Sequence, residues 1–159
     1  MSHDYESYGK VSGNYDLTRE PAGLEELIRI LSTLEPIGEL NLLSIGCGTG
    51  SYEIELAKNT RKVIGIDISA GMIEKASEKS REISNAKFLI GDATNLPIQN
   101  QKFDAALFIL SLHHVGSHTL QIRALEEAYN ALKPGALLVA QTISQRQLKD
   151  GIWYHDLIP

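Results

Sequence analysis

Three glycines at alternate positions and two aspartates further along the chain are the residues whose types and spacing suggest chemistry. Gly46, Gly48 and Gly50 lie in the stretch "SIGCGTG", directly after the apolar run "LNLL". Glycine lets a loop turn tightly and lets a ligand approach the backbone. Asp67 ends the stretch "VIGID" and Asp92 ends the stretch "FLIGD", so each acid follows a short apolar run. The pattern predicts a ligand-binding loop with two carboxylates nearby.

The spacing of these residues favours one class of ligand. A dinucleotide-binding loop requires G-x-G-x-x-G, but the third glycine here comes one position early, at Gly50. A P-loop is excluded because no Gly-Lys-Ser/Thr follows. Asp67 lies 21 residues after Gly46, near the spacing of an acid that accepts hydrogen bonds from ribose hydroxyls. Asp92 can accept from an exocyclic amine such as that of adenine, so the pattern predicts an adenosine pocket.

Elements that alternate along the chain position these residues. The runs "AALFIL" and "ALLVA" do not alternate polar with apolar residues, which is typical of strands buried on both faces. Alternation of such strands with helices predicts a parallel sheet covered by helices, with ligands at the carboxyl ends of the strands. Strands are expected at 40–45, 62–67, 86–92, 103–110 and 136–142, and helices at 23–34, 51–59, 70–83 and 118–132.

The spacing of apolar residues predicts which side chains the helices bury. Ser69 is a suitable N-cap for the third helix, and Lys133-Pro134-Gly135 is expected to end the fourth. The expected buried positions are Leu24, Leu27, Ile28, Leu31 and Leu34 in the first helix, Met72, Ile73, Ala76 and Ile83 in the third, and Leu125, Ala128, Tyr129 and Leu132 in the fourth.

Composition limits the class of protein. The 159 residues suit one domain, with 43% apolar and 22% charged residues. A net charge of -5 without a basic block disfavours non-specific nucleic-acid binding and leaves a folded tRNA or a protein partner open. The single cysteine, Cys47, excludes a disulfide within the chain and favours the cytoplasm; it is expected to be a small residue that fits the loop. No signal peptide or membrane span is expected, because the apolar runs are too short.

Five stretches together resemble class I S-adenosylmethionine-dependent methyltransferases, of the small-molecule type grouped with the ubiquinone and menaquinone biosynthesis methyltransferases. They are "LLSIGCGTG", "VIGIDISAGMIEKA", "FLIGDATNLP", "FDAALFILSLHHV" and "ALKPGALLVAQT", and they cover roughly residues 40–142 in the order and at the spacing of that family. The expected fold is a Rossmann-like α/β parallel sheet with strand order 3-2-1-4-5 and helices on both faces.

The resemblance implies S-adenosylmethionine as cofactor. The glycine loop would hold its methionine part, Asp67 its ribose, and Asp92 with Ala93 the adenine edge. The arm "YDLTREP" would fold over the cofactor and bring Arg19 near the methionine carboxylate, which suits a guanidinium. The residues expected at the cofactor are Tyr15, Arg19, Gly46, Cys47, Gly48, Gly50, Asp67, Ile68, Met72, Asp92, Ala93 and Ile109.

Two features depart from the family pattern. Members usually carry an acid two residues before the first glycine, which helps to hold the ammonium of the cofactor, and this chain has Ser44. Members also continue past the fifth strand into an antiparallel β-hairpin edge, whereas this sequence ends at Pro159. The expected organisation is an N-terminal arm or lid at 1–22, a cofactor-binding core at 23–145 and a tail at 146–159, with that hairpin missing.

The acceptor of the methyl group is left open by the sequence. His113 and His114 follow the fourth strand, where either could act as a general base or simply pack. The Asn/Asp-Pro-Pro-Tyr signature of methylation on bases and glutamine is absent, which favours a small-molecule acceptor. No metal is expected. Two alternatives remain: a cofactor-binding or interaction domain without turnover, and a nicotinamide-dependent oxidoreductase, although no Tyr-x-x-x-Lys pair is present. The sequence does not indicate an oligomeric state.

Overall fold

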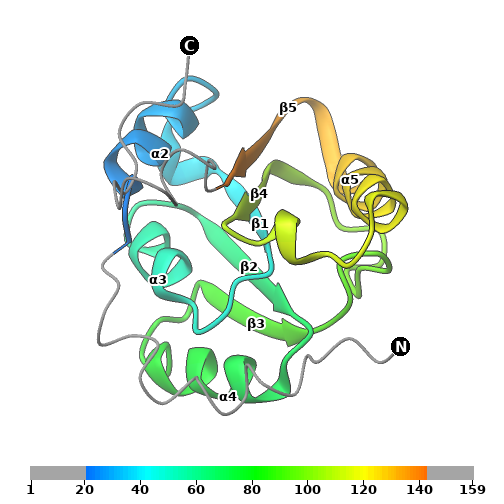
Figure 1. Ribbon diagram of the computed structural model, residues 1–159. Helices are drawn as coiled ribbons and strands as arrows, with labels where there is room; N and C mark the ends of the chain where they lie inside the picture. Colours follow the sequence, from blue (N-terminus) through cyan, green and yellow to red (C-terminus); the bar gives the residue numbers. More distant parts are fainter. Residues whose placement is uncertain (1–20, 143–159) are drawn as a thin grey trace, which may run out of the picture.

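The computed structural model of this protein describes residues 21–142, and its centre is one parallel sheet (Figure 1). The sheet has the strand order β3-β2-β1-β4-β5, and every neighbouring pair is parallel. This confirms the predicted Rossmann-like order. The strands are β1 (Asn41–Ile45), β2 (Lys62–Asp67), β3 (Ala86–Ile90), β4 (Phe103–Ile109) and β5 (Leu132–Gln141).

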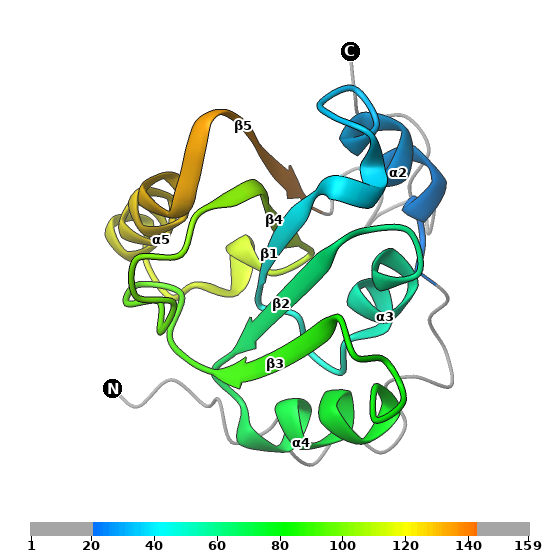
Figure 2. The ribbon, with the colours of Figure 1, turned by 180° about the vertical axis from the view of Figure 1, so that it is seen from behind.

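Helices cover both faces of the sheet, as predicted (Figures 1 and 2). One face packs against α2 and α3, the opposite face packs against α5, and α4 lies along β2 and β3. The helices are α2 (Leu24–Leu31), α3 (Ser51–Ala57), α4 (Ala70–Lys79) and α5 (His118–Ala131), joined by the short 3-10 helices η2 (Ile37–Glu39) and η3 (Leu112–His114).

The central strand β1 shows why the apolar runs do not alternate. Leu42 packs in the cluster that holds Leu56 of α3, and Leu43 packs in the cluster that holds Ala128 of α5. Successive side chains of a strand point to opposite faces, so a strand buried on both sides needs an apolar residue at every position. The strand has two polar residues: Asn41 at its start, which is partly buried, and Ser44, which is fully buried.

Two helices end earlier than predicted. The backbone N–H groups of Thr33 and Leu34 bond to carbonyls three residues back, so the chain tightens into a turn after Leu31. The third helix ends at Lys79, which leaves Ile83 outside it, although Ile83 still packs against the core. Leu34 and Ile83 therefore lie in turns, and from there they still contribute apolar surface to the core.

The prediction that Tyr129 is buried was wrong. Its side chain is 74% exposed, and the buried positions of α5 are Ala124, Ala128 and Ala131. These follow the spacing i, i+4, i+7, and Tyr129 lies about 100° around the helix from Ala128. A face of alanines places α5 close to the sheet, where a tyrosine ring would not fit. Lys133-Pro134-Gly135 follows the end of α5 as expected, but it lies within β5, next to a register shift between Phe103 and Ala105.

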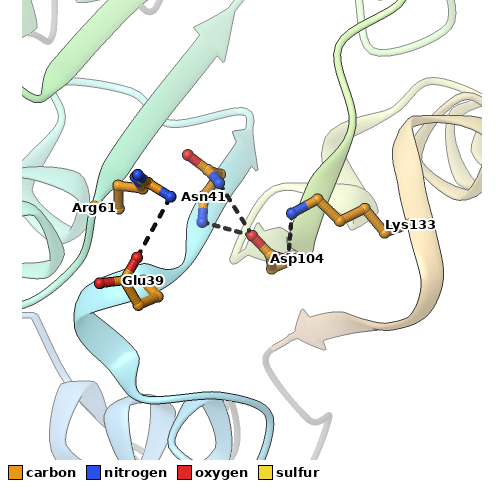
Figure 3. Close-up of polar contacts among 5 residues, drawn as sticks. All are labelled: Glu39, Asn41, Arg61, Asp104 and Lys133. Carbon is orange, nitrogen blue, oxygen red and sulfur yellow. Dashed lines mark hydrogen bonds and ion pairs between the residues drawn. The ribbon is translucent and has the colours of Figure 1, made fainter.

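A carboxylate network ties the strands together near their amino ends (Figure 3). Asp104 accepts hydrogen bonds from the backbone N–H of Asn41 at 2.8 Å and from Nζ of Lys133 at 2.7 Å. Burial alone would raise the pKa of Asp104, but the bonds from Lys133 and Asn41 hold it below its ordinary value. Arg61 and Glu39 form an ion pair nearby, at 3.4 Å. This network lies at the opposite end of the strands from the glycine loop.

Candidate functional site

The glycine loop joins β1 to α3 and is fastened to the end of β2. The backbone N–H groups of Gly46 and Cys47 both donate to the carbonyl of Ile66, at 2.7 and 3.0 Å. Gly50 closes the loop by donating to the carbonyl of Cys47 at 3.1 Å. The loop lies where strand order reverses between β1 and β4, which is where open parallel sheets bind ligands.

The three glycines of the loop have different surroundings. A methyl group at Gly46 would lie 2.4 Å from Cβ of Ser111, and one at Gly50 would lie 2.7 Å from the ring of Phe88. Both of these glycines are required by the protein's own packing. Among the residues that the structure describes, 21–142, a methyl group at Gly48 would meet nothing within 4 Å. Gly48 is therefore the position at which the backbone faces open space and a ligand can approach.

Asp67 ends β2 and is held in a fixed orientation beside this opening. Its Oδ2 accepts from the backbone N–H of Gly48 at 2.9 Å, and its Oδ1 accepts from the backbone N–H of Ser69 at 2.9 Å. A carboxylate oxygen can accept more than one hydrogen bond. Asp67 can therefore position the loop and still accept hydrogen bonds from the hydroxyls of a ligand.

Apolar side chains lie exposed at the same edge of the sheet. Ile68 follows β2 and is 45% exposed, and Ile90 at the end of β3 is 57% exposed. The register places Ile90 opposite Asp67. Two exposed isoleucines beside a carboxylate offer apolar surface to a flat ring. By contrast, Met72 and Ile109 are buried, so their side chains belong to the core in this structure.

Asp92 lies in the loop after β3, adjacent to the end of β2. Gly91 donates its N–H to the carbonyl of Asp67 at 2.9 Å, which brings this loop to the site. Oδ1 of Asp92 accepts from the N–H and the hydroxyl of Thr94, both at 2.8 Å, and forms a local turn. Asp92 is exposed, and its Oδ2 makes no hydrogen bond within residues 21–142. Ala93 packs partly buried against the core.

The two histidines lie in η3, after β4. Both are exposed, and their ring centroids are 4.1 Å apart. Nδ1 of His113 lies 3.3 Å from the hydroxyl of Thr142. Although the residue is exposed, nearby protein atoms partly remove water from the ring and lower the pKa of His113, so the neutral ring, which can accept a proton, prevails at pH 7. A role as base and a role in packing both stay predictions.

Sequence reasoning missed Glu53, which lies on the buried face of α3. Its side chain is 1% exposed, and its Oε1 accepts the hydroxyl proton of Ser44 at 2.5 Å. Burial raises the pKa of Glu53 from 4.5 to about 7. The spacing i, i+3, i+4 places Glu53 on one face with Leu56 and Ala57, and this acid on an apolar face was the signal that could have identified it.

The thiol of Cys47 is part of the same group of side chains. Burial raises its pKa well above the ordinary value, and the carboxyls of Glu53 and Asp67 add to the rise. The thiol is therefore protonated at neutral pH and is a poor nucleophile. This supports the interpretation of Cys47 as a small residue that fits the loop.

Some predicted features lie outside the residues described. Tyr15 and Arg19 belong to the part of the chain before residue 21, and the predicted tail and missing hairpin lie after residue 142, so these stay predictions. Among residues 21–142 there is no cluster of His, Cys, Asp and Glu that could hold a metal ion. In the same range no helix combines the length and apolar character needed to cross a membrane.

Comparisons with known proteins give a consistent family. A family model described as a methyltransferase domain matches residues 42–135. The chain is 28% identical over 148 residues to a demethylmenaquinone methyltransferase of Staphylococcus saprophyticus, covering 89% of this chain and 62% of the relative. It is 36% identical over 112 residues to a demethylmenaquinone methyltransferase of Staphylococcus aureus, covering 69% of this chain and 45% of the relative.

A solved structure supports the same grouping. The crystal structure of a SAM-dependent methyltransferase from Methanosarcina mazei is 31% identical, with a TM-score of 0.61, and the match covers 69% of this chain and 55% of that one. The chain spans between 45% and 62% of the length of the two curated relatives.

Proposed function

Since this chain belongs to the methyltransferase domain family, we propose that it binds S-adenosylmethionine and transfers its methyl group to a small molecule. The observation that carries the proposal is the open face of Gly48 next to the oriented carboxylate of Asp67. Gly48 lets a ligand approach the backbone, and Asp67 can accept hydrogen bonds from hydroxyl groups. An adenosine with an amino-acid substituent requires both.

The residues present fit the three parts of this cofactor. Asp67 would accept hydrogen bonds from the ribose hydroxyls, because both of its oxygens are held at the mouth of the loop. Ile68 and Ile90 would supply apolar surface to the adenine ring, and Oδ2 of Asp92 an acceptor for its amine. The methionine part would lie along the loop at Gly48.

The bound cofactor would supply a methyl group on a positively charged sulfur, which a nucleophile can displace in line. The chain itself would bind, orient and exclude water, and such positioning can lower a barrier by about 7–11 kcal/mol. A neutral His113 could take a proton from an acceptor that needs a base. A strong nucleophile would need no base.

Several features support a small-molecule acceptor. The two curated relatives are demethylmenaquinone methyltransferases, and we propose an acceptor of comparable size for this chain. The net charge of -5 makes nucleic acid an unfavourable partner. A location in the cytoplasm, inferred from the single cysteine, is part of the same proposal.

Calorimetric titration of the purified chain tests the cofactor assignment. We expect S-adenosylmethionine and S-adenosylhomocysteine to bind and NAD not to bind, because the loop lacks the third glycine position of a pyrophosphate site. Binding of NAD alone would contradict the proposal. Formation of S-adenosylhomocysteine with demethylmenaquinone, the compound named for the relatives, is measured separately. Binding without any product would favour a cofactor-binding domain without turnover.

Replacing Asp67 tests the ribose contact. Asp67→Ala should weaken the binding of S-adenosylhomocysteine by about 1–3 kcal/mol, the range for hydrogen bonds to a charged acceptor. Asp104→Ala is the matched control, because Asp104 also accepts from a backbone N–H but lies at the amino ends of the strands. Equal affinities of the two variants would refute the role of Asp67.

A further inference from the structure

The side chain of Glu53 carries an acceptor that the described part of the protein leaves without a hydrogen bond. Glu53 is buried in α3, and Oε1 is occupied by the hydroxyl of Ser44. Within residues 21–142, Oε2 is buried and has no partner. A buried carboxyl with an unsatisfied oxygen is costly and is retained where it has a task.

The surroundings of Glu53 place its carboxyl near the groups of the glycine loop. Ser44 is the second-last residue of β1, which ends at Ile45, and the loop begins at Gly46. The charges that act on Glu53 from neighbouring elements are Asp67 at the end of β2 and Lys79 at the end of α4, and Glu53 in turn raises the pKa of Cys47 within the loop. The carboxyl is therefore part of the electrostatic environment of the candidate site.

We propose that Glu53 supplies the anion that holds the ammonium group of the methionine part, from α3 in place of the strand acid that position 44 lacks. The proposal rests on the proposed function. Ser44 and Glu53 would form one unit, in which the hydroxyl orients the carboxyl through Oε1 and leaves Oε2 for the ammonium. A cationic N–H donor is the partner that a buried carboxylate prefers. Glu53 would be a residue that positions the cofactor.

Proton release provides a signature that a purely structural role would not give. Burial raises the pKa of Glu53 to about 7, so about half of the molecules carry its proton at pH 7 without ligand. An ammonium group binds the ionised form, and the carboxyl then gives its proton to the buffer. The heat of binding at pH 7 should therefore depend on the ionisation enthalpy of the buffer, and this dependence should vanish in Glu53→Gln.

The experiment compares two ligands by calorimetry at pH 8. Glu53→Gln should weaken S-adenosylhomocysteine by about 10- to 100-fold, the range for a lost hydrogen bond to a charged group. Methylthioadenosine, which lacks the amino-acid part, should bind wild type and variant equally. The double variant Ser44→Asp, Glu53→Ala returns the carboxylate to the strand and should recover most of the affinity. Glu55→Gln is the control on the same helix, since Glu55 is only partly buried and is paired with Lys58.

The outcomes separate the two proposals. Unchanged affinity of Glu53→Gln for S-adenosylhomocysteine would overturn the role of Glu53 and leave the proposed function intact. Equal weakening of both ligands would also overturn it, because a general disturbance of the loop would then be the cause. Failure of wild type to bind S-adenosylhomocysteine at all would remove the proposed function and this inference together. Circular dichroism confirms that each variant is folded.

Discussion

Between pH 5 and pH 8 the free energy of unfolding of this protein is expected to fall by about 2–3 kcal/mol through Glu53 alone, and Glu53→Gln is expected to abolish that fall. Burial, the largest cause, raises the pKa of Glu53 from 4.5 to about 7 in the folded state. Between these values the folded state binds more protons than the unfolded state, so stability decreases as pH rises. The loss is nearly complete by pH 8, where the curve levels off.

Urea unfolding of wild type and Glu53→Gln across this range measures the effect. The two proteins should be similar at pH 5, where the wild-type carboxyl is neutral, and the variant should be the more stable at pH 8. The difference between them isolates Glu53, because all other titrating groups are shared. Glu55→Gln should keep the slope of wild type. Parallel curves for wild type and Glu53→Gln would show that Glu53 ionises as an ordinary exposed acid does.

This pH dependence of the free energy of unfolding would mean that the protein is less stable at neutral pH because it carries Glu53 at the candidate site. A glutamine or a leucine at position 53 would satisfy the core better than a carboxyl with one unpartnered oxygen. Functional sites are where a sequence breaks a local rule without a structural gain. A stable Glu53→Gln protein with weakened binding would therefore connect the stability result to the role proposed for Glu53.

The sheet could be predicted from the sequence because its rules are local. Strands buried on both faces appear as uninterrupted apolar runs, and Leu42 with Leu43 shows the cause, since each contacts a different helix layer. Helix ends were harder to place, because Leu34 continues the apolar spacing of the first helix although it lies in a tight turn after that helix has ended. Tyr129 fitted the spacing of a buried face. It is nevertheless exposed, because α5 packs closely against the sheet through Ala124 and Ala128, and this packing depends on contacts between segments that are distant in the sequence.

Some features of the candidate site could likewise be predicted from the sequence, and others could not. The glycine spacing and the position of Asp67 at a strand end are sequence features, and the structure brings Asp67 within 2.9 Å of the N–H of Gly48. Contacts between segments that are distant in the sequence could not be predicted from it. Ser111 packs against Gly46, and its hydroxyl donates a hydrogen bond to the carbonyl of Ile45 at 2.5 Å. The sequence around position 111 contains no pattern that predicts these contacts. Which glycine faces a ligand likewise depends on neighbours from other strands.

Alanine substitutions at Gly46 and Gly48 should separate packing from binding. Both glycines have positive φ, 75° and 55°, so alanine costs about 1–2 kcal/mol at either position. At Gly46 the added methyl group also lies 2.4 Å from Cβ of Ser111, and such overpacking costs a further 1–3 kcal/mol or so. Gly46→Ala should therefore lower the free energy of unfolding by about 2–5 kcal/mol, and Gly48→Ala by only about 1–2 kcal/mol.

Among the folded variants, the affinity for the ligand should fall more for Gly48→Ala than for Gly46→Ala, which is the reverse of their ranking by lost stability. The methyl group of Gly48→Ala would project into the open space where we place the methionine part, so S-adenosylhomocysteine should bind at least about tenfold more weakly. Gly135→Ala is the matched control, because Gly135 in β5 has φ 79° and an added methyl group there also meets no atom of the described part of the chain within 4 Å. It should lose similar stability and keep full affinity. If Gly48→Ala and Gly135→Ala bound S-adenosylhomocysteine equally well, the open face of Gly48 would be ordinary solvent-exposed backbone, and the ligand would have to approach the sheet elsewhere.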